Sequence, residues 1–538
     1  MKALKYLMAG VAFFTATTSG LMMTSCTDLE ETPYTFMDPN SYYTNEAEVE
    51  TALAATYNRF RRIYSGNNSL YVAHLELLTE QGWPCYTKDN MDNISKWAYA
   101  NDASQGGVMK VWGTGYECVN RANIVLERVN AVPMSDESRN RIKGQALFLR
   151  GYTFFHLLRL WGGIPLPLSY TKSIEGLEMP RATIDESYEQ AIKDIEAAAE
   201  LLPERGTANY DVWRITKGAC HAALGQIYLY RATMNNNNNE YLTLSKSYSK
   251  KVIDSQKYSL MPNYTDNFYW FSNTAKNNQE SIFELQYSAQ SGQSNNMHIR
   301  FGLGRTNNAY MGCYQYCRFG VSGFLYKEML ENNDKRAEAM LTYYEGDGDG
   351  TKDANGNLIY QPHTYNPDLY KWEPRVTNDK GGEHMCVFNT KYFDRTTDYT
   401  LQQPCANFGI LRYADVLLNY AEAANLLQAG DGVNELNLVR NRAGVGACPY
   451  SSQAEIDNDI LNQRRYEFFG EAKVYFDELR KDKIGDFAQA KCVEGVQKGI
   501  IYLSDLVFKP SKSYLFKIPQ GDLDGNPALV QNPDNVSK

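Results

Sequence analysis

The sequence predicts an all-α fold, in which a tetratricopeptide-type helical repeat scaffold carries a large insertion rich in loops and aromatic residues. In the first half of the chain and again near its end, apolar residues recur at three- and four-residue spacing. From about residue 256 to 409 this helical pattern fades, and Asn, Gly, Tyr and Gln dominate instead. The chain has 538 residues, more than one compact core usually holds, so either two lobes or a scaffold with an insertion is expected.

Helices are expected to follow one another through the first half of the chain. Pro133, the Gly162–Gly163 pair and Pro203 separate the apolar-periodic segments and mark their ends. Small residues such as Ala222 let a partner helix approach closely, which is typical of tetratricopeptide-type helix pairs. The helices expected in this half cover residues 47–64, 111–131, 139–160, 184–202, 213–234 and 241–254.

The helical pattern returns after the insertion, at residues 411–428, 433–442 and 455–480. Within the insertion, residues 281–285 read as a short strand. We therefore expect a leader at residues 1–25 and one domain at 26–538, with its scaffold at about 40–255 and 410–495 and a ligand-face insertion at about 256–409. Because loops on a rigid scaffold commonly carry binding residues, this layout predicts a binding face built by the insertion.

The N-terminus has the pattern of an export signal. Lys2 and Lys5 precede a short apolar stretch at residues 6–14, which is too short to span a bilayer. Small and polar residues then lead to Cys26, in a setting that resembles a bacterial lipobox with Met23 in place of the usual leucine. Acylation of Cys26 by several chains would anchor the protein to a membrane, since one chain binds only marginally. The acidic residues Asp28, Glu30 and Glu31 that follow resemble the export tag of Bacteroidetes surface lipoproteins.

Charge and motif content exclude several function classes. The net charge of −9 is spread without a basic stripe, so no nucleic-acid partner is expected. Six histidines and scattered cysteines give no metal-site spacing, and neither a G-x-S-x-G nor an H-E-x-x-H motif is present. Glu467 and Glu471 could form a carboxylate pair, but Arg464 precedes Glu467 by three residues, which favours a structural ion network. We therefore expect a protein that is not an enzyme.

Several separated motifs resemble the SusD/RagB family, and together they run the length of the chain. Two departures occur in the segment 463–474, which resembles the family helix E-R-x-x-E-x-x-x-E-[GA]-x-R: Gln463 stands in place of the first glutamate and Val474 in place of the last arginine. The motifs that carry the resemblance are I-K-G-Q-A-L-F-L-R-G-Y-T-F-F-H-L-L-R-L-W-G-G-I-P at residues 142–165, R-A-T-I-D-E-S-Y-E-Q-A-I-K-D-I at 181–195, L-R-Y-A-D at 411–415, L-N-L-V-R-N-R-A at 436–443, I-P at 518–519 and N-P-A-L-V-Q-N-P at 526–533.

The resemblance implies an all-helical tetratricopeptide-type scaffold with a loop-rich ligand face. It further implies a lipid-anchored protein on the outer-membrane surface, which covers a SusC-like TonB-dependent transporter and captures glycan for it. RagB-like relatives handle peptides instead, so peptide cargo is the alternative function.

Aromatic residues are the expected glycan contacts. The chain has 40 tyrosines and 7 tryptophans, whose flat apolar faces stack on sugar rings while Asn, Asp, Arg and Gln bond the hydroxyls. Trp112 and Trp161 are left out, because each lies among apolar neighbours on an expected helix; Trp97 is ambiguous. The predicted ligand-binding residues form a first cluster of Trp83, Tyr86, Asp89 and Asn90, and a second of Tyr269, Trp270, Tyr314, Tyr316, Arg318 and Trp372.

Two alternatives remain open from the residues alone. The Asp/Gly segment from Asp347 to Gly356 resembles part of a calcium loop, although Leu358 stands where the bidentate glutamate belongs. A solvated turn is the favoured reading, so no cofactor is expected and bound calcium is the alternative. A tetratricopeptide adaptor that binds only protein is disfavoured by the lipobox and by the aromatic insertion.

Overall fold

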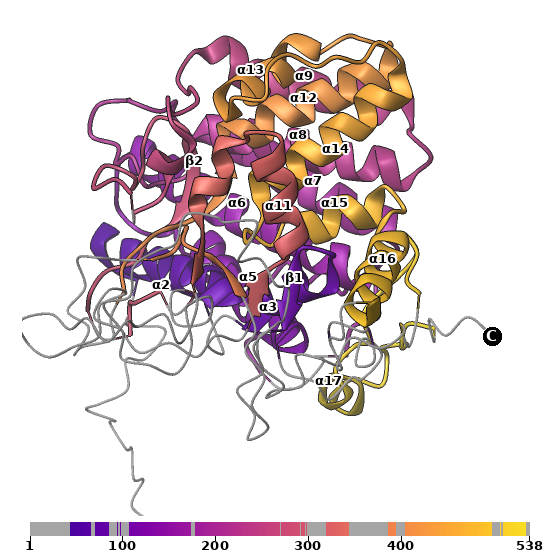
Figure 1. Cartoon of the computed structure of the whole chain (residues 1–538). Coiled ribbons are helices and arrows are strands. Elements are labelled where there is room, and N and C mark those ends of the chain that lie inside the picture. The colour runs from indigo at the N-terminus through magenta and orange to yellow at the C-terminus, as the bar shows by residue number, and fades with distance from the viewer. Residues whose placement is uncertain are drawn as a thin grey trace, which may run out of the picture. The chain divides into compact units, whose positions relative to one another are not determined.

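Helices dominate the computed structural model of the chain, as the apolar spacing predicts (Figure 1). From residue 45 onward the chain belongs to one compact unit, Asn45–Lys538, to which the following description applies. The structure describes residues 43–65, 70–84, 94, 97, 107–173, 178–269, 271–290, 292–295, 297, 319–343, 386–393, 404–497, 506 and 509–533.

The helices of the first half pack one against the next along the chain. Helix α2 packs on α5, α5 on α6, α6 on α7, α7 on α8 and α8 on α9. Five of the expected helices begin within about three residues of their predicted start, and the short helix α3 was not predicted. These helices are α2 (Glu46–Ser65), α3 (Leu70–Leu78), α5 (Met109–Arg128), α6 (Asp136–Trp161), α7 (Ile184–Leu201), α8 (Lys217–Met234) and α9 (Asn239–Ser255).

Capping residues fix the ends of these helices. The Ser135 side chain accepts a hydrogen bond from the Ser138 backbone N–H at the start of α6, and Thr183 and Glu186 form a capping box on α7. Helix α6 ends at Gly162, whose φ of +76° suits glycine. Thr216 caps α8, so this helix begins at Lys217 and not at residue 213 as predicted. Small residues do admit a partner helix: a Cβ at Gly225 would lie 2.6 Å from the Ser249 hydroxyl of α9.

The second set of helices continues the same stack after the insertion. Helix α12 packs on α8 and α9, although the insertion separates α9 from α12 in the sequence. The predicted helix at 455–480 is two helices, because the chain turns at Gly470 (φ +73°) and Ala472 (φ +55°). The helices here are α12 (Tyr413–Leu427), α13 (Val433–Ala443), α14 (Gln453–Phe468), α15 (Val474–Arg480), α16 (Ile484–Gln497) and α17 (Gln520–Gly525).

Two small antiparallel sheets organise the insertion. The predicted strand at 281–285 is present as β2 (Ser281–Leu285), and it pairs with β6 (Phe408–Arg412), so Leu411 and Arg412 lie in a strand and not in a helix. The second sheet has the order β1–β3–β5–β4. Its strands are β1 (Gly82–Pro84), β3 (Phe319–Val321), β4 (Met340–Tyr343) and β5 (Cys386–Asn389), and α11 (Gly323–Glu331) and two short 3-10 helices, η3 (Tyr264–Asn267) and η4 (Lys335–Ala339), accompany it.

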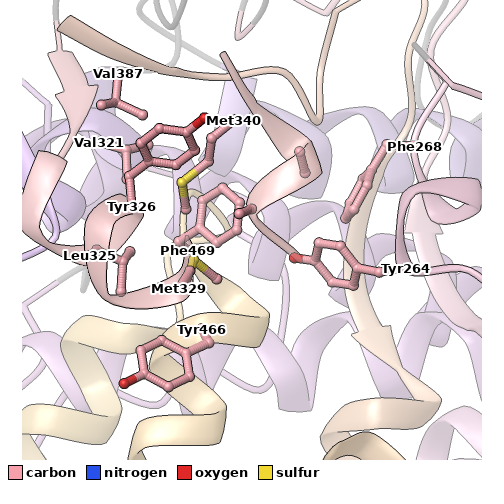
Figure 2. Close-up of a cluster of buried hydrophobic side chains, with 12 residues drawn as sticks. Tyr264, Phe268, Val321, Leu325, Tyr326, Met329, Met340, Val387, Tyr466 and Phe469 are labelled. Atoms are coloured by element: carbon pink, nitrogen blue, oxygen red, sulfur yellow. The ribbon is translucent and has the colours of Figure 1, made fainter. Parts of the chain in front are cut away.

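A buried cluster of hydrophobic residues joins the insertion to the scaffold (Figure 2). Met329 of α11 and Val387 of β5 lie in the same cluster as Tyr466 of α14 and Phe469, which follows it. Met329 and Phe469 are fully buried. The insertion therefore shares a hydrophobic core with α14, and this core fixes the four-stranded sheet against the helices.

The predicted core tryptophans are buried. Trp112 of α5 and Trp161 of α6 form an edge-to-face pair with ring centroids 5.2 Å apart. Trp97, which the sequence left open, is also buried and donates from Nε1 to the Leu78 carbonyl at 3.2 Å. Among the described cysteines, Cys118, Cys220 and Cys448 are free thiols.

The C-terminal segment packs against the exit of α6. The Asn532 side-chain amide donates to the carbonyls of Trp161 at 3.0 Å and Phe516 at 2.7 Å. In return, Trp161 Nε1 donates to the Lys517 carbonyl at 2.9 Å. Two motifs that lie far apart in the sequence, W-G-G-I-P and Q-N-P, thus form one contact. Among the helices that the structure describes, none has the length and apolar character needed to cross a bilayer.

Candidate functional site

The four-stranded sheet brings Trp83 next to residues that directly follow the predicted contact Arg318 in the sequence. Strand β1 contains Trp83, and its antiparallel partner β3 begins directly after Arg318. In this pair Trp83 lies opposite Gly320. Trp83 is described here by its backbone and Tyr269 in full; the other predicted contacts lie outside the described residues, namely Tyr86, Asp89, Asn90, Trp270, Tyr314, Tyr316, Arg318 and Trp372.

A buried lysine fixes the position of β1. Lys491 of α16 donates from Nζ to the carbonyls of Leu77 at 2.7 Å, Thr79 at 2.6 Å and Gly82 at 3.3 Å. Burial lowers the pKa of Lys491 to about 8, so at neutral pH the ammonium group is still charged and its protons are shared among these carbonyls. The end of α3 and the start of β1 are therefore held by one side chain.

Tyr269 lines a small internal cavity whose wall also includes Arg412 and Glu471 of the ion network described below. It is half-buried, and the Lys276 ammonium lies 4.9 Å from its ring centroid. The cavity that Tyr269 lines with Lys391 and Arg412 has a volume of about 20 Å³, which holds a water molecule and not a sugar ring. A contact of Tyr269 with glycan, if it forms, must therefore occur outside this cavity, and the role of Tyr269 stays a prediction.

Glu467 and Glu471 are parts of a buried ion network, as the sequence favoured. Arg412 donates to Glu467 Oε1 at 2.9 Å and to Glu471 Oε1 at 2.8 Å, and it also reaches Glu280 at 2.6 Å. The expected partner was wrong: Arg464 pairs with Asp477 at 2.8 Å. Sequence spacing identified the network but missed the long-range arginines.

The network keeps both carboxylates ionised. Burial alone would raise the pKa of Glu467, but the guanidinium groups of Arg442, Arg412 and Arg336 outweigh it and lower this pKa to about 2. Burial acts in the same sense on Glu471, and Arg412 and Lys391 again outweigh it, so its pKa lies well below the usual range. A glycosidase acid needs a raised pKa and access to the sugar. This pair has neither, and its geometry suits a structural role.

An open pocket lies beside β2, and its aromatic residue was missed by the sequence analysis. Trp213 was assigned to a helix, but it lies in the turn before α8, half-buried at the edge of this pocket. The signal that identifies it is Thr216: a threonine that caps a helix starting at Lys217 leaves Trp213 outside that helix. Among the described residues, no group of three or more His, Cys, Asp and Glu is placed to hold a metal; the Asp347 segment lies outside them.

Comparison with known proteins finds relatives over most of the chain, both in sequence and in structure. A "SusD-like protein" of Bacteroides ovatus is 24% identical over 86% of this chain and 80% of its own length, and "SusD-like protein P2" of Formosa agariphila is 23% identical over 95% and 97%. A solved "Laminarin binding SusD-like protein" superimposes with a TM-score of 0.70 at 22% identity, covering 91% of this chain and 100% of that one. Surface glycan-binding protein A from Bacteroides thetaiotaomicron, in complex with laminarihexaose, gives a TM-score of 0.67 at 22% identity, with 91% and 100% covered.

Two family models match in series along the chain. The model described as "Starch-binding associating with outer membrane" covers residues 29–229, and the model described as "SusD family" covers residues 279–534. The first includes the helices α2 to α7 and most of α8, and the second includes β2, β6 and the C-terminal segment that contacts α6. Together with the shared fold, these matches show that the chain belongs to the SusD/RagB family.

Proposed function

We propose that this protein is a cell-surface lipoprotein that binds an oligo- or polysaccharide and delivers it to a SusC-like TonB-dependent transporter of the outer membrane. The observation that carries the proposal is the β1–β3 pair, because it sets Trp83 beside a strand that begins directly after the predicted contact Arg318 in the sequence. Family relatives of the same fold that are named for laminarin or laminarihexaose binding support glycan as the cargo. Binding, not cleavage, is the proposed activity.

The proposed chemistry is modest. Aromatic rings stack on the apolar faces of sugar rings, and amide, carboxylate and guanidinium groups bond the hydroxyls. Because sugars bring little apolar area and the site is wet, affinity should come from several weak contacts along one glycan. The residues proposed for this role are those predicted from the sequence around Trp83 and in the insertion.

The proposed anchor is Cys26. Acylation of this residue by a bacterial lipoprotein pathway would hold the protein at the outer membrane, where a transporter partner is found. The family description, which refers to association with the outer membrane, supports this location.

The test is native affinity electrophoresis of the mature protein, starting after Cys26, through gels that contain laminarin, amylopectin or other polysaccharides. Retardation by one glycan is expected. It should be lost in a variant that combines Trp83→Ala, Trp270→Ala and Trp372→Ala, and retained in the matched variant with Phe at the same three positions, since Phe keeps a stacking ring.

Two results would contradict the proposal. If no polysaccharide retards the protein and calorimetry shows that oligopeptides bind, the cargo is peptide. If a glycan retards the protein but the alanine variant is retarded equally, glycan binds elsewhere than at the predicted aromatic residues. Repeating the successful gel with EDTA also tests whether calcium takes part, because a calcium-dependent site loses retardation when the ion is removed.

A further inference from the structure

An open pocket of about 520 Å³ lies between α2, the turn that precedes α8, and β2 with the segment after it. This volume falls in the range of small-molecule sites. We propose that the pocket binds one uncharged pyranose unit, as a second contact for the glycan of the proposed function, on which this inference rests. The residues that line it include Tyr57, Asn58, Arg61, Trp213, Gln286 and Gln293.

The aromatic wall of this pocket is held rigidly. The Tyr57 ring meets Trp213 edge to face, with centroids 5.9 Å apart and ring planes at 72°. The Tyr57 hydroxyl is itself fixed, since it donates to Gln145 Oε1 at 2.8 Å and accepts from the Ile215 backbone N–H at 3.2 Å. Because Tyr57 is fixed, it holds the Trp213 ring that packs against it in place. An aromatic ring that is already ordered loses little conformational entropy when a ligand stacks on it, which favours binding.

The Arg214 guanidinium makes a cation–π contact with the Trp213 ring. The Arg214 guanidinium carbon lies 4.7 Å from the centroid of the Trp213 ring, and Arg214 is not among the residues that line the pocket. Arg214 is held in turn by Glu50 at 3.0 Å and Asp211 at 3.2 Å. One side of the indole is therefore covered by protein, and another side is left to the pocket.

The pocket also presents hydrogen-bonding groups that the described part of the chain does not use. Within that part, the Trp213 indole N–H, the Asn58 amide and the Gln293 side-chain NH₂ have no hydrogen-bond partner, while Gln293 Oε1 accepts from Ser288 at 2.9 Å. All three belong to residues that line the pocket. A flat aromatic surface beside amide and indole donors matches a sugar ring, which has apolar C–H faces and hydroxyls at its edge.

The two charged residues that line the pocket, Arg61 and Glu284, already make hydrogen bonds within the protein, and this indicates a neutral ligand. Arg61 donates to the carbonyls of Gln293 at 3.2 Å, Gly292 at 3.3 Å and Gln286 at 3.4 Å, and it lies over the Tyr287 ring. The other charged residue in the wall is Glu284, whose carboxylate accepts from the Asn277 backbone and from Asn407. Both terminal nitrogens of Arg61 are occupied by backbone carbonyls, and the Glu284 carboxylate lies in the same wall, so uronic or sulfated sugars are disfavoured.

The pocket adjoins the predicted ligand face. Glu284 lines both this pocket and the small cavity of Tyr269. Lys276, which lies over the Tyr269 ring, donates to the Tyr287 carbonyl, and Tyr287 lies beneath Arg61 of the pocket. A glycan that follows the insertion past Tyr269 can therefore reach Trp213, and this pocket would hold a further unit of it.

The experiment is calorimetric titration of the mature protein with laminarihexaose, together with affinity gels that contain laminarin, amylopectin or the anionic polymer polygalacturonate. Trp213→Ala should weaken binding of the retarding neutral glycan about tenfold, and Trp213→Phe should restore most of it. The matched control is Tyr450→Ala, which removes an exposed aromatic residue that does not line the pocket and should change nothing. Thermal unfolding of each variant confirms that the fold is intact.

A ¹⁹F NMR measurement detects the contact in the wild-type protein itself, so it does not depend on whether the alanine variant folds. In protein labelled with 5-fluorotryptophan, the ¹⁹F resonance that disappears in Trp213→Phe belongs to Trp213, and it should shift when the retarding glycan, or laminarihexaose, is added. The inference is overturned if glycan binds and this resonance stays in place with Trp213→Ala unaffected, while the proposed function stands. It is also overturned if polygalacturonate alone requires Trp213. If no glycan binds the wild-type protein, the proposed function fails first.

Discussion

Trp83 lies directly opposite Gly320 in the antiparallel pair of β1 and β3. These two positions belong to different parts of the chain. Trp83 follows the scaffold helix α3, and Gly320 lies in the insertion, in the strand β3. Backbone hydrogen bonds between them give both segments a common support, and Lys491 fixes that support to α16. The pairing therefore brings Trp83 and Gly320, which lie far apart in the sequence, side by side in one sheet.

Gly82 should be essential for the position of β1. A Cβ at Gly82 would lie 2.3 Å from the Glu76 carbonyl oxygen, a contact that backbone must move to relieve. We expect Gly82→Ala to lower the free energy of unfolding by about 1–3 kcal/mol and to weaken glycan retardation. Gly113→Ala is the matched control, because its Cβ would meet nothing within 4 Å. Equal stability of the two variants in urea titrations would contradict the prediction.

Glu467→Gln should destabilise the protein strongly at neutral pH. The change leaves Arg412 and Arg442 buried without the carboxylate that both contact, and breaking such a buried pair costs about 3–5 kcal/mol. The folded-state pKa of Glu467, about 2, lies below its ordinary value of 4.5. Its stabilising effect is therefore present above about pH 4.5 and lost as pH falls toward 2.

Denaturant titrations at pH 7 and at pH 3.5 measure this effect. The difference in unfolding free energy between wild type and Glu467→Gln should be smaller at the lower pH. Glu117→Gln is the control, since Glu117 pairs with Arg59 at the surface and should contribute less than about 1 kcal/mol. A difference that grows on acidification would show that the carboxylate is protonated in the native state.

Asn532→Ala should loosen the C-terminal contact with α6. Its side chain donates to the carbonyls of Trp161 and Phe516. The Trp161 carbonyl also accepts from Arg181, so the Phe516 carbonyl is the buried group left unsatisfied, at a cost of about 1–3 kcal/mol. The midpoint of thermal unfolding should fall. Asn458→Ala, at an exposed position of α14, should leave it nearly unchanged. An unchanged midpoint in both variants would mean that the C-terminal segment does not contribute to stability.

Cys26→Ala should release the protein from the membrane fraction. Without the thiol no acyl chain can be attached at this position, and with it a labelled fatty acid should be incorporated. Fractionation of cells that express each form, followed by protease treatment of intact cells, tests both anchor and surface exposure. Cys448→Ala is the control. Membrane retention of Cys26→Ala would place the anchor elsewhere.

Local sequence rules identified most helices here because the signals are local. Ser135 and Thr183 cap their helices, and Gly162 ends α6, as their residue types indicate. The predicted helix boundaries were wrong where tertiary contacts determine the backbone conformation. The turn at Gly470 breaks a strongly periodic segment because the chain packs against Asn389 of β5: a Cβ at Gly470 would lie 1.9 Å from the Asn389 amide nitrogen.

The site was harder to predict than the fold. Aromatic composition pointed to the Trp83 and insertion segments, but their proximity depends on strand pairing, which has no sequence signal in three-residue strands such as β1 and β3. Glu467 was correctly assigned to a network, yet its partners Arg412 and Arg442 come from other elements. Trp213 was assigned to a helix because the apolar spacing of α8 continues on the N-terminal side of Thr216, into the turn that precedes the helix.

The pairing of β2 with β6 has an evolutionary consequence. Ser281 lies opposite Arg412 and Leu285 opposite Phe408, so the chain departs from the helical stack and returns to it at one place. Lengthening a segment closed in this way costs little, about 0.6 kcal/mol for each doubling of its length. Duplicated genes can therefore acquire longer or shorter segments between these strands without disturbing the β2–β6 pairing.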